Sequence, residues 1–598
     1  MRRPRILAAT GAVALAAMTL GATPATRATA ATAPRSTAAG TTPGSFAVLA
    51  ERTADVDRVV RGLRAEGATV LTVNRAIGLV TVRSARADFA RTARGLDGVR
   101  GAARDGVVGR SPDARVGRDA GPTRDVRPNR DDVLRENQAA ARPVAARTTN
   151  RTTVARPPGG GSTSSDPLDA KLWGMDMIHA EAAHAIELGD PRVRVGVMDT
   201  GVDGRHPDLA ENFDRRLSRN FTTDIPAVDG PCESTSCKDP VDRDDNGHGT
   251  HVAGTIGASL NGFGLSGVAP RVDLVNVRAG QDSGFFFLGP TANALTYSGD
   301  AGLDVVNMSF YVDPWLYSCE GGAPEDSPEQ AAEQDLVIET MQRALAYAHG
   351  KGVTLVGALG NNHEDLAAPR TDTSSPDYPG GTEHPRTIDN ATCWDLPVEG
   401  PYVIGVSSLG PSGRKSDFSN HTTDLASDEI ELSAPGGWFR DGLGTPTYRT
   451  NGNQILSTAP LHVLRSEGQV DAGGNVTPLG QSFGTTRQCG TVDGVSVCGY
   501  YQYLQGTSMA APHAAGVAAL AVSAHGQRIG RLGFGLAPAR VRGILLDSAT
   551  DHACPVGGVQ SYADVGRDAE FTATCTGTAA FNGFYGAGIV DALGAVTG

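Results

Sequence analysis

The chain has 598 residues, a formal net charge of −13 at pH 7, 40% apolar residues and 5% aromatic residues. This apolar content excludes a mainly disordered chain, and the length is sufficient for several domains. The charge is distributed unevenly, because residues 1–156 hold 27 arginines against 13 acidic residues, whereas the remainder holds 26 basic and 53 acidic residues.

A basic leader ahead of an acidic body is typical of two kinds of protein. It can be a nucleic-acid-binding arm, or one of two parts that attract each other and later separate. The arginines are dispersed singly and no aromatic residues are interleaved with them, which favours the second interpretation. We therefore expect no nucleic-acid partner.

The first 30 residues have the features of a signal peptide. Arg2, Arg3 and Arg5 precede an apolar, alanine-rich run over 6–22, and Ala28-Thr29-Ala30 is a small-residue cleavage pattern. A membrane anchor is the alternative, but the run is short and no stop-transfer pattern follows it. The arginine pair leaves both general and twin-arginine export open. We expect an exported, extracellular protein that is free of the membrane after cleavage.

Residues 45–108 predict a small α+β unit. Strand patterns at 46–49, 70–73, 79–82 and 106–108 alternate with apolar stripes of helical spacing, one of them Val56, Val59, Val60 and Leu63. The order β-α-β-β-α-β is ferredoxin-like. The expected boundaries are 31–110 for this unit and 111–165 for an exposed, cleavable linker rich in arginine, proline and glycine.

From residue 166 to 598 the pattern becomes an alternation of strands and helices. Buried strands are expected at 193–198, 272–277, 304–309, 353–358 and 402–406, and a long helix at 329–349. Such alternation predicts an α/β fold with a doubly wound, mostly parallel sheet. In these sheets, sites form at the carboxyl ends of the strands, where Asp199 is expected.

Eight cysteines, all in the acidic part, agree with export. Of the 105 formal pairings, closeness in sequence favours 232–237, 489–498 and 554–575, which leaves 319–393. A zinc site is the alternative, but no pair has the C-x2-C spacing. We therefore expect disulfides.

Three short segments carry an acid, a base and a hydroxyl nucleophile. They are Asp199-Thr200-Gly201-Val202-Asp203, His248-Gly249-Thr250-His251-Val252-Ala253-Gly254 and Gly506-Thr507-Ser508-Met509-Ala510-Ala511-Pro512. Proline is tolerated in the first turn of a helix, so Pro512 predicts that Ser508 stands at a helix N-terminus, where the helix dipole favours developing negative charge.

Each segment also has a simpler interpretation. Asp199 could be a turn residue, Ser508 a helix cap and His248 a capping histidine, while His248 with His251 suggests zinc but lacks the zincin spacing and glutamate. A given four-residue string arises by chance in a chain of this length at only ~0.004, so three such segments together favour catalysis.

The three segments resemble the active-site signatures of the subtilisin-like serine peptidases (subtilases, peptidase family S8), in the chain order Asp, His, Ser. The resemblance covers roughly 166–598, and 45–108 resembles the family's inhibitory propeptide. It implies that Ser508 attacks the scissile carbonyl, that His248 transfers the proton and that Asp199 orients the imidazole. It also implies that Asn361, in Ala358-Leu359-Gly360-Asn361, completes the oxyanion hole.

Two departures from the family pattern limit what the resemblance implies. The substrate-binding strand reads Ser309-Phe310-Tyr311-Val312 where the family has glycines, so the residue preferred before the cleaved bond cannot be transferred. Ser309, Phe310, Tyr311, Ala358 and Gly360 are the expected substrate-binding residues. Phe310 and Tyr311 are expected to narrow the cleft.

The calcium loop also departs from the family, since 260–265 looks short. Asp208 matches a family calcium ligand, but a turn-capping role is favoured, and Asp242, Asp244 and Asp245 are expected in a solvated loop. No catalytic metal or cofactor is expected, and structural calcium stays open.

These observations predict a secreted serine endopeptidase made as a self-inhibited zymogen. Its partners would be protein or peptide substrates and its own propeptide, and it would act as a monomer. The alternative is a catalytically inactive relative that binds peptides. A dedicated peptidase for one substrate also stays open.

Overall fold

The computed structural model describes residues 44–105, 165–427, 429–492, 494–529 and 533–598. The predicted signal peptide, and the predicted linker apart from its last residue, lie outside these ranges. Among the residues that are described, no helix is both long enough and apolar enough to cross a membrane.

Residues 44–105, here called the N-terminal unit, form a four-stranded antiparallel sheet of order β2-β3-β1-β4 with two helices. Its elements are β1 (Gly44–Ala50), α1 (Val56–Ala65), β2 (Thr69–Asn74), β3 (Leu79–Ser84), α2 (Phe89–Arg94) and β4 (Val99–Arg104). The predicted stripe of α1 is buried, because positions i, i+3, i+4 and i+7 share one helix face. The ferredoxin-like order is therefore confirmed.

The last strand of this unit was expected too late in the chain. Residues 106–108 lie outside the described ranges, and β4 is formed instead by Val99-Arg100-Gly101-Ala102-Ala103-Arg104. Glycine and alanine have low strand propensity, so nothing local marks this segment. Antiparallel pairing with β1 makes it a strand.

The larger part, residues 165–598, contains a seven-stranded parallel sheet of order β13-β12-β10-β8-β5-β7-β6. The strands are β5 (Arg194–Met198), β6 (Arg219–Asn220), β7 (Asp273–Arg278), β8 (Val305–Met308), β10 (Thr354–Ala358), β12 (Val403–Leu409) and β13 (Leu432–Pro435). All five predicted strands are present, since continuous runs of apolar residues suit strands that are covered on both faces.

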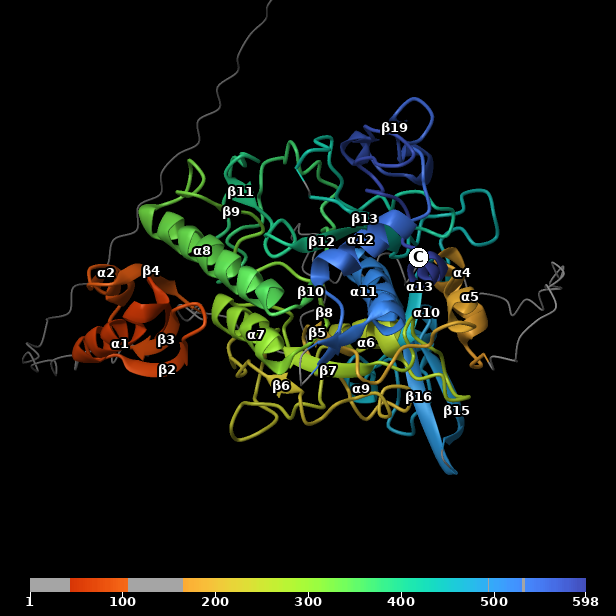
Figure 1. Ribbon diagram of the computed structural model, residues 1–598, viewed down its shortest axis with the longest axis horizontal. Helices are drawn as coiled ribbons and strands as arrows, with labels where there is room; N and C mark the ends of the chain where they lie inside the picture. Colours follow the sequence, from red (N-terminus) through yellow and green to blue (C-terminus); the bar gives the residue numbers. More distant parts are fainter. Residues whose placement is uncertain (1–43, 106–164, 428, 493, 530–532) are drawn as a thin grey trace, which may run out of the picture. The chain divides into compact units, whose positions relative to one another are not determined.

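Helices cover both faces of this sheet (Figure 1). On one face α11 (Thr507–His525) packs against β8, β10 and β12, and α6 (His248–Gly257) packs beside it. On the other face α7 (Leu288–Ala301) packs against α8 (Pro328–Gly350), the long helix predicted at 329–349. A capping box begins α8, in which Ser327 and Gln330 exchange hydrogen bonds.

Shorter elements surround this core. The helices are α4 (Trp173–Met177), α5 (Ala180–His184), α9 (Leu461–Ser466), α10 (Pro478–Ser482), α12 (Pro538–Ser548) and α13 (Ala592–Thr597). The strands are β9 (Ser318–Cys319), β11 (Cys393–Trp394), β14 (Ile455–Thr458), β15 (Thr486–Val492), β16 (Val495–Leu504), β17 (Gln527–Ile529), β18 (Gly533–Gly535), β19 (Val559–Gln560) and β20 (Ala573–Thr574).

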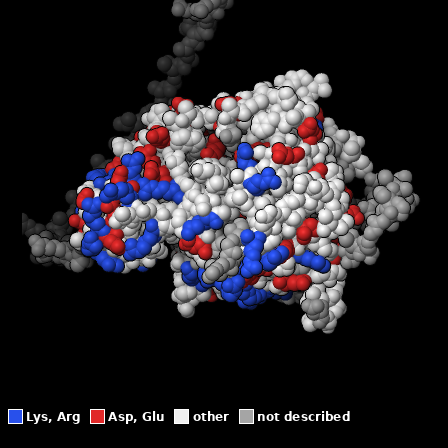
Figure 2. Space-filling model, in the orientation of Figure 1, with Lys and Arg blue, Asp and Glu red and all other residues white. Residues whose placement is uncertain are grey.

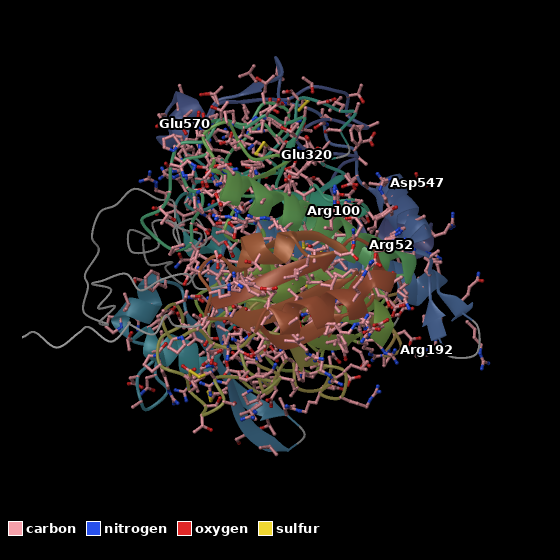
Figure 3. All side chains as sticks on the ribbon, turned by 90° about the vertical axis from the view of Figure 1, so that its left-hand side faces the viewer. Arg52, Arg100, Arg192, Glu320, Asp547 and Glu570 are labelled. Carbon is pink, nitrogen blue, oxygen red and sulfur yellow. A yellow bond between two sulfur atoms is a disulfide. The ribbon has the colours of Figure 1, made fainter. Side chains whose placement is uncertain are left out.

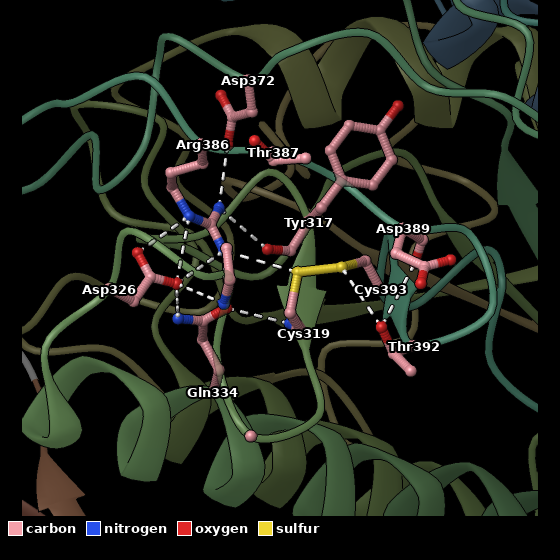
Figure 4. The surroundings of a disulfide bond; sticks show 12 residues. Tyr317, Cys319, Asp326, Gln334, Asp372, Arg386, Thr387, Asp389, Thr392 and Cys393 are labelled. Carbon is pink, nitrogen blue, oxygen red and sulfur yellow. Dashed lines mark hydrogen bonds and ion pairs between the residues drawn. A yellow bond between two sulfur atoms is a disulfide. The ribbon is translucent and has the colours of Figure 1, made fainter.

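All four predicted disulfides are formed: 232–237, 319–393, 489–498 and 554–575. The longest-range bridge joins β9 to β11 beside a buried arginine (Figure 4). Arg386 donates to Asp372, Asp326 and Gln334, so its charge is neutralised inside the protein. Such a bridge over 74 residues restricts the unfolded chain.

The N-terminal unit lies within the same compact unit as the larger part. Arg343 of α8 donates to the carbonyl oxygens of Ala50, Ile77 and Glu51, and Asn74 donates to Thr296 of α7 at 2.7 Å. Leu49, Leu79 and Leu336 share one apolar cluster in this contact.

Charge contributes to this contact at its edge. Arg91 lies 3.0 Å from Glu329, and Arg100, labelled in Figure 3, lies 3.7 Å from Glu339. These exposed ion pairs are worth little individually. Figure 2 shows positive and negative side chains interspersed on the N-terminal unit, which holds 11 arginines and 7 acidic residues. Most of the positive charge of the leader therefore lies outside the described residues.

Candidate active site

Asp199 follows directly after β5, at the carboxyl end of the sheet, as the sequence predicts. Its carbonyl oxygen accepts hydrogen bonds from Ala279 N and Gly280 N, both at 3.1 Å. Its carboxylate Oδ1 accepts from Thr200 N at 2.8 Å and contacts His248 Nδ1 at 2.7 Å. The carboxylate is fully buried, so the aspartate and the histidine ring form a water-excluded pair.

His248 is the first residue of α6, and the helix begins close to Asp199 because Gly249 has no side chain. A Cβ atom on Gly249 would lie 2.2 Å from the Gly201 oxygen and 2.9 Å from the Asp199 Cβ. Any other residue would push the helix away and break the Asp199–His248 contact.

Asp244 anchors this helix start, although the sequence pattern favours a solvated loop there. It is fully buried, and its carboxylate accepts from the N–H and hydroxyl groups of Thr250 and from the hydroxyl of Thr200. The solvated-loop prediction is wrong for Asp244, because donors brought from both sides of the site satisfy its charge.

Ser508 is the second residue of α11, so its backbone N–H belongs to the turn that has no helical acceptors. Pro512 lies in the second turn rather than in the first, which corrects the argument made from the sequence. Proline has no N–H for the Ser508 carbonyl, and the Ser309 hydroxyl donates to that carbonyl instead, at 3.1 Å.

The structure does not join Ser508 to His248 by a hydrogen bond. The Ser508 hydroxyl donates to the Ser309 carbonyl at 3.3 Å, and His248 Nε2 has no hydrogen-bond partner among the described residues. His251, the second histidine of the motif, is turned away, since its Nε2 lies 3.0 Å from the Ile455 carbonyl oxygen. Burial lowers the His251 pKa to about 3. The two histidines therefore do not form a metal-binding pair.

Asn361 lies beside the start of α11. Its Oδ1 accepts from both the N–H and the hydroxyl of Thr507, each at 2.9 Å. Both side-chain contacts use the oxygen, so the Nδ2 donor has no acceptor among the described residues. An amide held in this way can donate to an oxygen atom that develops negative charge beside Ser508.

The loop that carries Asn361 depends on Asn420, a residue that the sequence analysis did not identify. Asn420 Nδ2 donates to the Leu359 carbonyl, and its Oδ1 accepts from Asn362 N and Glu364 N, all at 3.0 Å. Gly360 has φ +105°, and a Cβ there would lie 2.3 Å from Asn420 Nδ2. No local motif announces a contact that spans 60 residues.

The predicted substrate-binding residues take different positions. Phe310 is only 5% exposed and stacks on Phe286 with ring centroids 4.0 Å apart, so its ring belongs to the core. The expectation that the Phe310 ring narrows the cleft is wrong for this reason. Tyr311 is partly buried, and its hydroxyl donates to Asp377 at 2.6 Å. Ala358 ends β10, directly before the loop of Gly360 and Asn361.

The calcium candidates of the sequence analysis are held by protein groups. Asp208 accepts from Leu265 N at 3.0 Å and from the Tyr501 hydroxyl at 2.8 Å, and burial raises its pKa to about 8. Asp242 binds Arg205 and Arg215. Asp245 binds Arg243 and lies 3.2 Å from His462. These contacts fit structural ion pairs and hydrogen bonds better than calcium ligation.

A family model described as "Subtilase family" matches residues 190–588. The chain belongs to the subtilase family. This match spans all the residues of the candidate site, from Asp199 to Ser508.

This subtilase is 28% identical to fervidolysin from Fervidobacterium pennivorans over 364 residues, which cover 59% of this chain and 38% of fervidolysin. It is 27% identical to thermitase from Thermoactinomyces vulgaris over 298 residues, which cover 50% of this chain and 81% of thermitase. The chain spans 38% of fervidolysin and 53% of a thermostable alkaline protease from Halalkalibacterium halodurans.

A solved structure shares the fold along most of this subtilase. The epidermin leader peptide processing serine protease (EpiP) from Staphylococcus aureus has a TM-score of 0.56 and 17% identity, with coverage of 93% of this chain and 98% of that chain. At this identity the likeness supports the subtilisin-like fold and nothing further.

Proposed function

We propose that this subtilase is a secreted serine endopeptidase that hydrolyses peptide bonds through an acyl-enzyme intermediate. Ser508 attacks the scissile carbonyl carbon, and His248 Nε2 takes the hydroxyl proton and returns it to the leaving amine. Asp199 holds the imidazole in the required tautomer. The Ser508 N–H and Asn361 Nδ2 donate to the oxyanion. This chemistry needs no metal or cofactor.

The contact of 2.7 Å between Asp199 Oδ1 and His248 Nδ1 is the observation that carries this proposal. It leaves His248 Nε2 as the basic nitrogen, and that atom has no competing partner among the described residues. The proposal requires the Ser508 hydroxyl to exchange the Ser309 carbonyl for His248 Nε2 as its acceptor. Catalytic hydrogen bonds are often incomplete before substrate binds.

The same proposal assigns the N-terminal unit as an inhibitory propeptide. Its last described residue, Asp105, accepts from Gly289 N at 3.2 Å, at the start of α7. A cavity of about 510 Å³ lies there, lined by residues of both parts, including Arg94, Phe287, Leu288, Trp315 and Tyr378.

The remaining parts of the proposal concern partners and location. Protein or peptide substrates and the propeptide would be the partners, and the protein would act as a monomer outside the cell. The four disulfides support an oxidising compartment.

A serine-reactive fluorophosphonate probe tests the proposal directly. The purified protein should be labelled in a one-to-one ratio and should cleave a casein substrate, while Ser508→Ala should lose both properties and retain the full-length leader. Ser496→Ala, on the exposed part of β16, is the matched control and should behave like the wild type. A processed wild-type protein that stays unlabelled would favour the inactive, peptide-binding alternative.

A further inference from the structure

Asn420 lies against the loop that carries the proposed oxyanion donor. Its side chain is fully buried, and among the described residues it forms hydrogen bonds only with that loop. Nδ2 donates to the Leu359 carbonyl, and Oδ1 accepts from Asn362 N and Glu364 N, each at 3.0 Å. One carboxamide therefore holds the chain on both sides of Asn361.

The backbone of the same segment adds hydrogen bonds to this loop. Asn420 N donates to the Gly360 carbonyl at 3.0 Å, and His363 N donates to the Phe418 carbonyl at 2.8 Å. One of these contacts precedes Asn361 in the chain and the other follows it. Because Phe418 and Asn420 are only two residues apart, a single short stretch of chain supports the loop from both ends.

This loop needs such support because it leaves the central sheet. β10 ends at Ala358, and Leu359 N still donates to the Val406 carbonyl of β12 at 3.1 Å. Gly360 then has φ +105°, which turns the chain away from the strand. Backbone groups that leave a sheet need other partners. The carboxamide of Asn420 offers both donors and acceptors, and it pairs one carbonyl and two N–H groups of the loop.

The partners of the Asn420 carboxamide fix its orientation. Two N–H groups, those of Asn362 and Glu364, face one of its terminal atoms, and the Leu359 carbonyl faces the other. Only the oxygen can accept and only the nitrogen can donate, so the reversed amide would place donors against donors and an acceptor against an acceptor. The side chain is therefore restricted to one orientation.

Buried serine hydroxyls connect Asn420 to the central sheet. Ser419 Oγ donates to the Asn420 carbonyl and accepts from Ser408 N of β12, both at 3.0 Å. Ser416 N donates to the Ser408 carbonyl at 2.9 Å. All three serines are fully buried. Because β12 is the neighbour of β10 in the sheet, two adjacent strands together determine the position of the loop.

We propose that Asn420 is a positioning residue for the oxyanion donor, an inference that rests on the proposed function, in which Asn361 Nδ2 donates to the oxyanion. Asn420 fixes the backbone on each side of Asn361, while Thr507 holds the amide oxygen of Asn361. An oxyanion donor acts at about 2.7–3.1 Å, and a displacement of ~1 Å can cost about 100-fold in rate. Loss of Asn420 should therefore affect the transition state more than substrate binding.

A double-mutant cycle between Asn361 and Asn420 tests this inference. Each variant is expressed as the full chain, and hydrolysis of a chromogenic peptide is normalised to the active sites titrated with a fluorophosphonate, so that unprocessed protein is not counted. Asn420→Ala should lower kcat about 10- to 100-fold and change KM by less than about 2-fold. In an Asn361→Ala background it should lower kcat by less than about 2-fold more, because the donor that it positions is already absent.

Asn582→Ala is the matched control for a purely structural role. Asn582 is also fully buried, and its side chain makes four hydrogen bonds to backbone groups, none of them in residues 359–364. Both Asn582→Ala and Asn420→Ala should lower the unfolding temperature by several degrees. Only Asn420→Ala should lower kcat, and equal values of kcat in the two variants would overturn the inference.

The cycle separates failure of this inference from failure of the proposed function. Wild-type kcat in Asn361→Ala would refute the proposed oxyanion donor and the inference with it. A large loss in Asn361→Ala but none in Asn420→Ala would refute the positioning role alone, and so would fully multiplicative losses in the double variant. If Asn420→Ala does not fold, Asn420→Asp replaces it in the same cycle, because it keeps an acceptor for Asn362 N and lacks the donor for the Leu359 carbonyl.

Discussion

Replacement of Asn361 by alanine separates the proposed oxyanion donor from the rest of the site. The substitution removes Nδ2, which has no acceptor among the described residues, and also Oδ1, which accepts two hydrogen bonds from Thr507. The first loss should affect the transition state, and the second should affect the folded state. The two effects can be measured independently.

The size of each effect follows from these contacts. Loss of one oxyanion donor raises the barrier by about 2.7–4 kcal/mol, so kcat should fall about 100- to 1000-fold with little change in KM. Loss of two hydrogen bonds at 2.9 Å should lower the free energy of unfolding by roughly 1–3 kcal/mol. The protein should therefore remain folded.

The assay is hydrolysis of a chromogenic peptide, normalised to the active sites titrated with a fluorophosphonate. Thr507→Val is the control, because it removes one contact to Asn361 Oδ1 and the hydrogen bond from Gly360 N to the same hydroxyl, but leaves Nδ2 in place. It should reduce kcat by about 10-fold at most. An Asn361→Ala enzyme with wild-type kcat would refute the oxyanion role, and so would a Thr507→Val enzyme impaired as severely as Asn361→Ala.

Three further predictions concern the triad, a buried lysine and the N-terminal unit. Asp199→Asn should lower kcat about 10⁴-fold, because an amide favours the wrong imidazole tautomer; a loss below 10-fold would contradict its orienting role. Burial lowers the pKa of Lys415 to about 7 from 10.5, so the unfolded state binds more protons between these values and stability rises with pH. In a Ser508→Ala background, urea unfolding measures the free energy of unfolding at each pH, and Lys415→Met should abolish roughly 3–5 kcal/mol of its rise with pH. If the free energy of unfolding of the Lys415→Met variant rises with pH as steeply as before, the assignment is disproved. Arg343→Ala should speed the appearance of activity from the full chain about 10-fold, because three hydrogen bonds to the N-terminal unit are lost; Arg343→Lys should be intermediate, and unchanged kinetics would argue against this contact as the inhibitory one.

The secondary structure was predictable where the signal is local. The strand that ends directly before Asp199, the stripe of α1 and the helix at 329–349 are all visible in the sequence, because buried strands and amphipathic helices impose a pattern on their own residues. Strand β4 was misplaced because its Gly-Ala-Ala core has no such pattern. Pairing with β1 supplies the hydrogen bonds that make it a strand.

The candidate site divides in the same way. Asp199, His248, Ser508 and Asn361 stand in short motifs whose chemistry can be recognised one segment at a time. Their supporting residues cannot be recognised in this way. Asn420 holds the loop of Asn361, and it contacts residues about 60 positions away.

The sequence by itself indicated the fold class, favoured the disulfide pairs that the structure forms and singled out Asp199, His248 and Ser508 as the candidate acid, base and nucleophile. Only the tertiary structure decided which polar side chains are buried and what satisfies them. It buries Asp244 among donors, directs the Phe310 ring into the core and places Asn420 against the loop that carries Asn361. Burial and hydrogen bonding depend on segments brought together from distant parts of the chain, and that information is not written in any single motif.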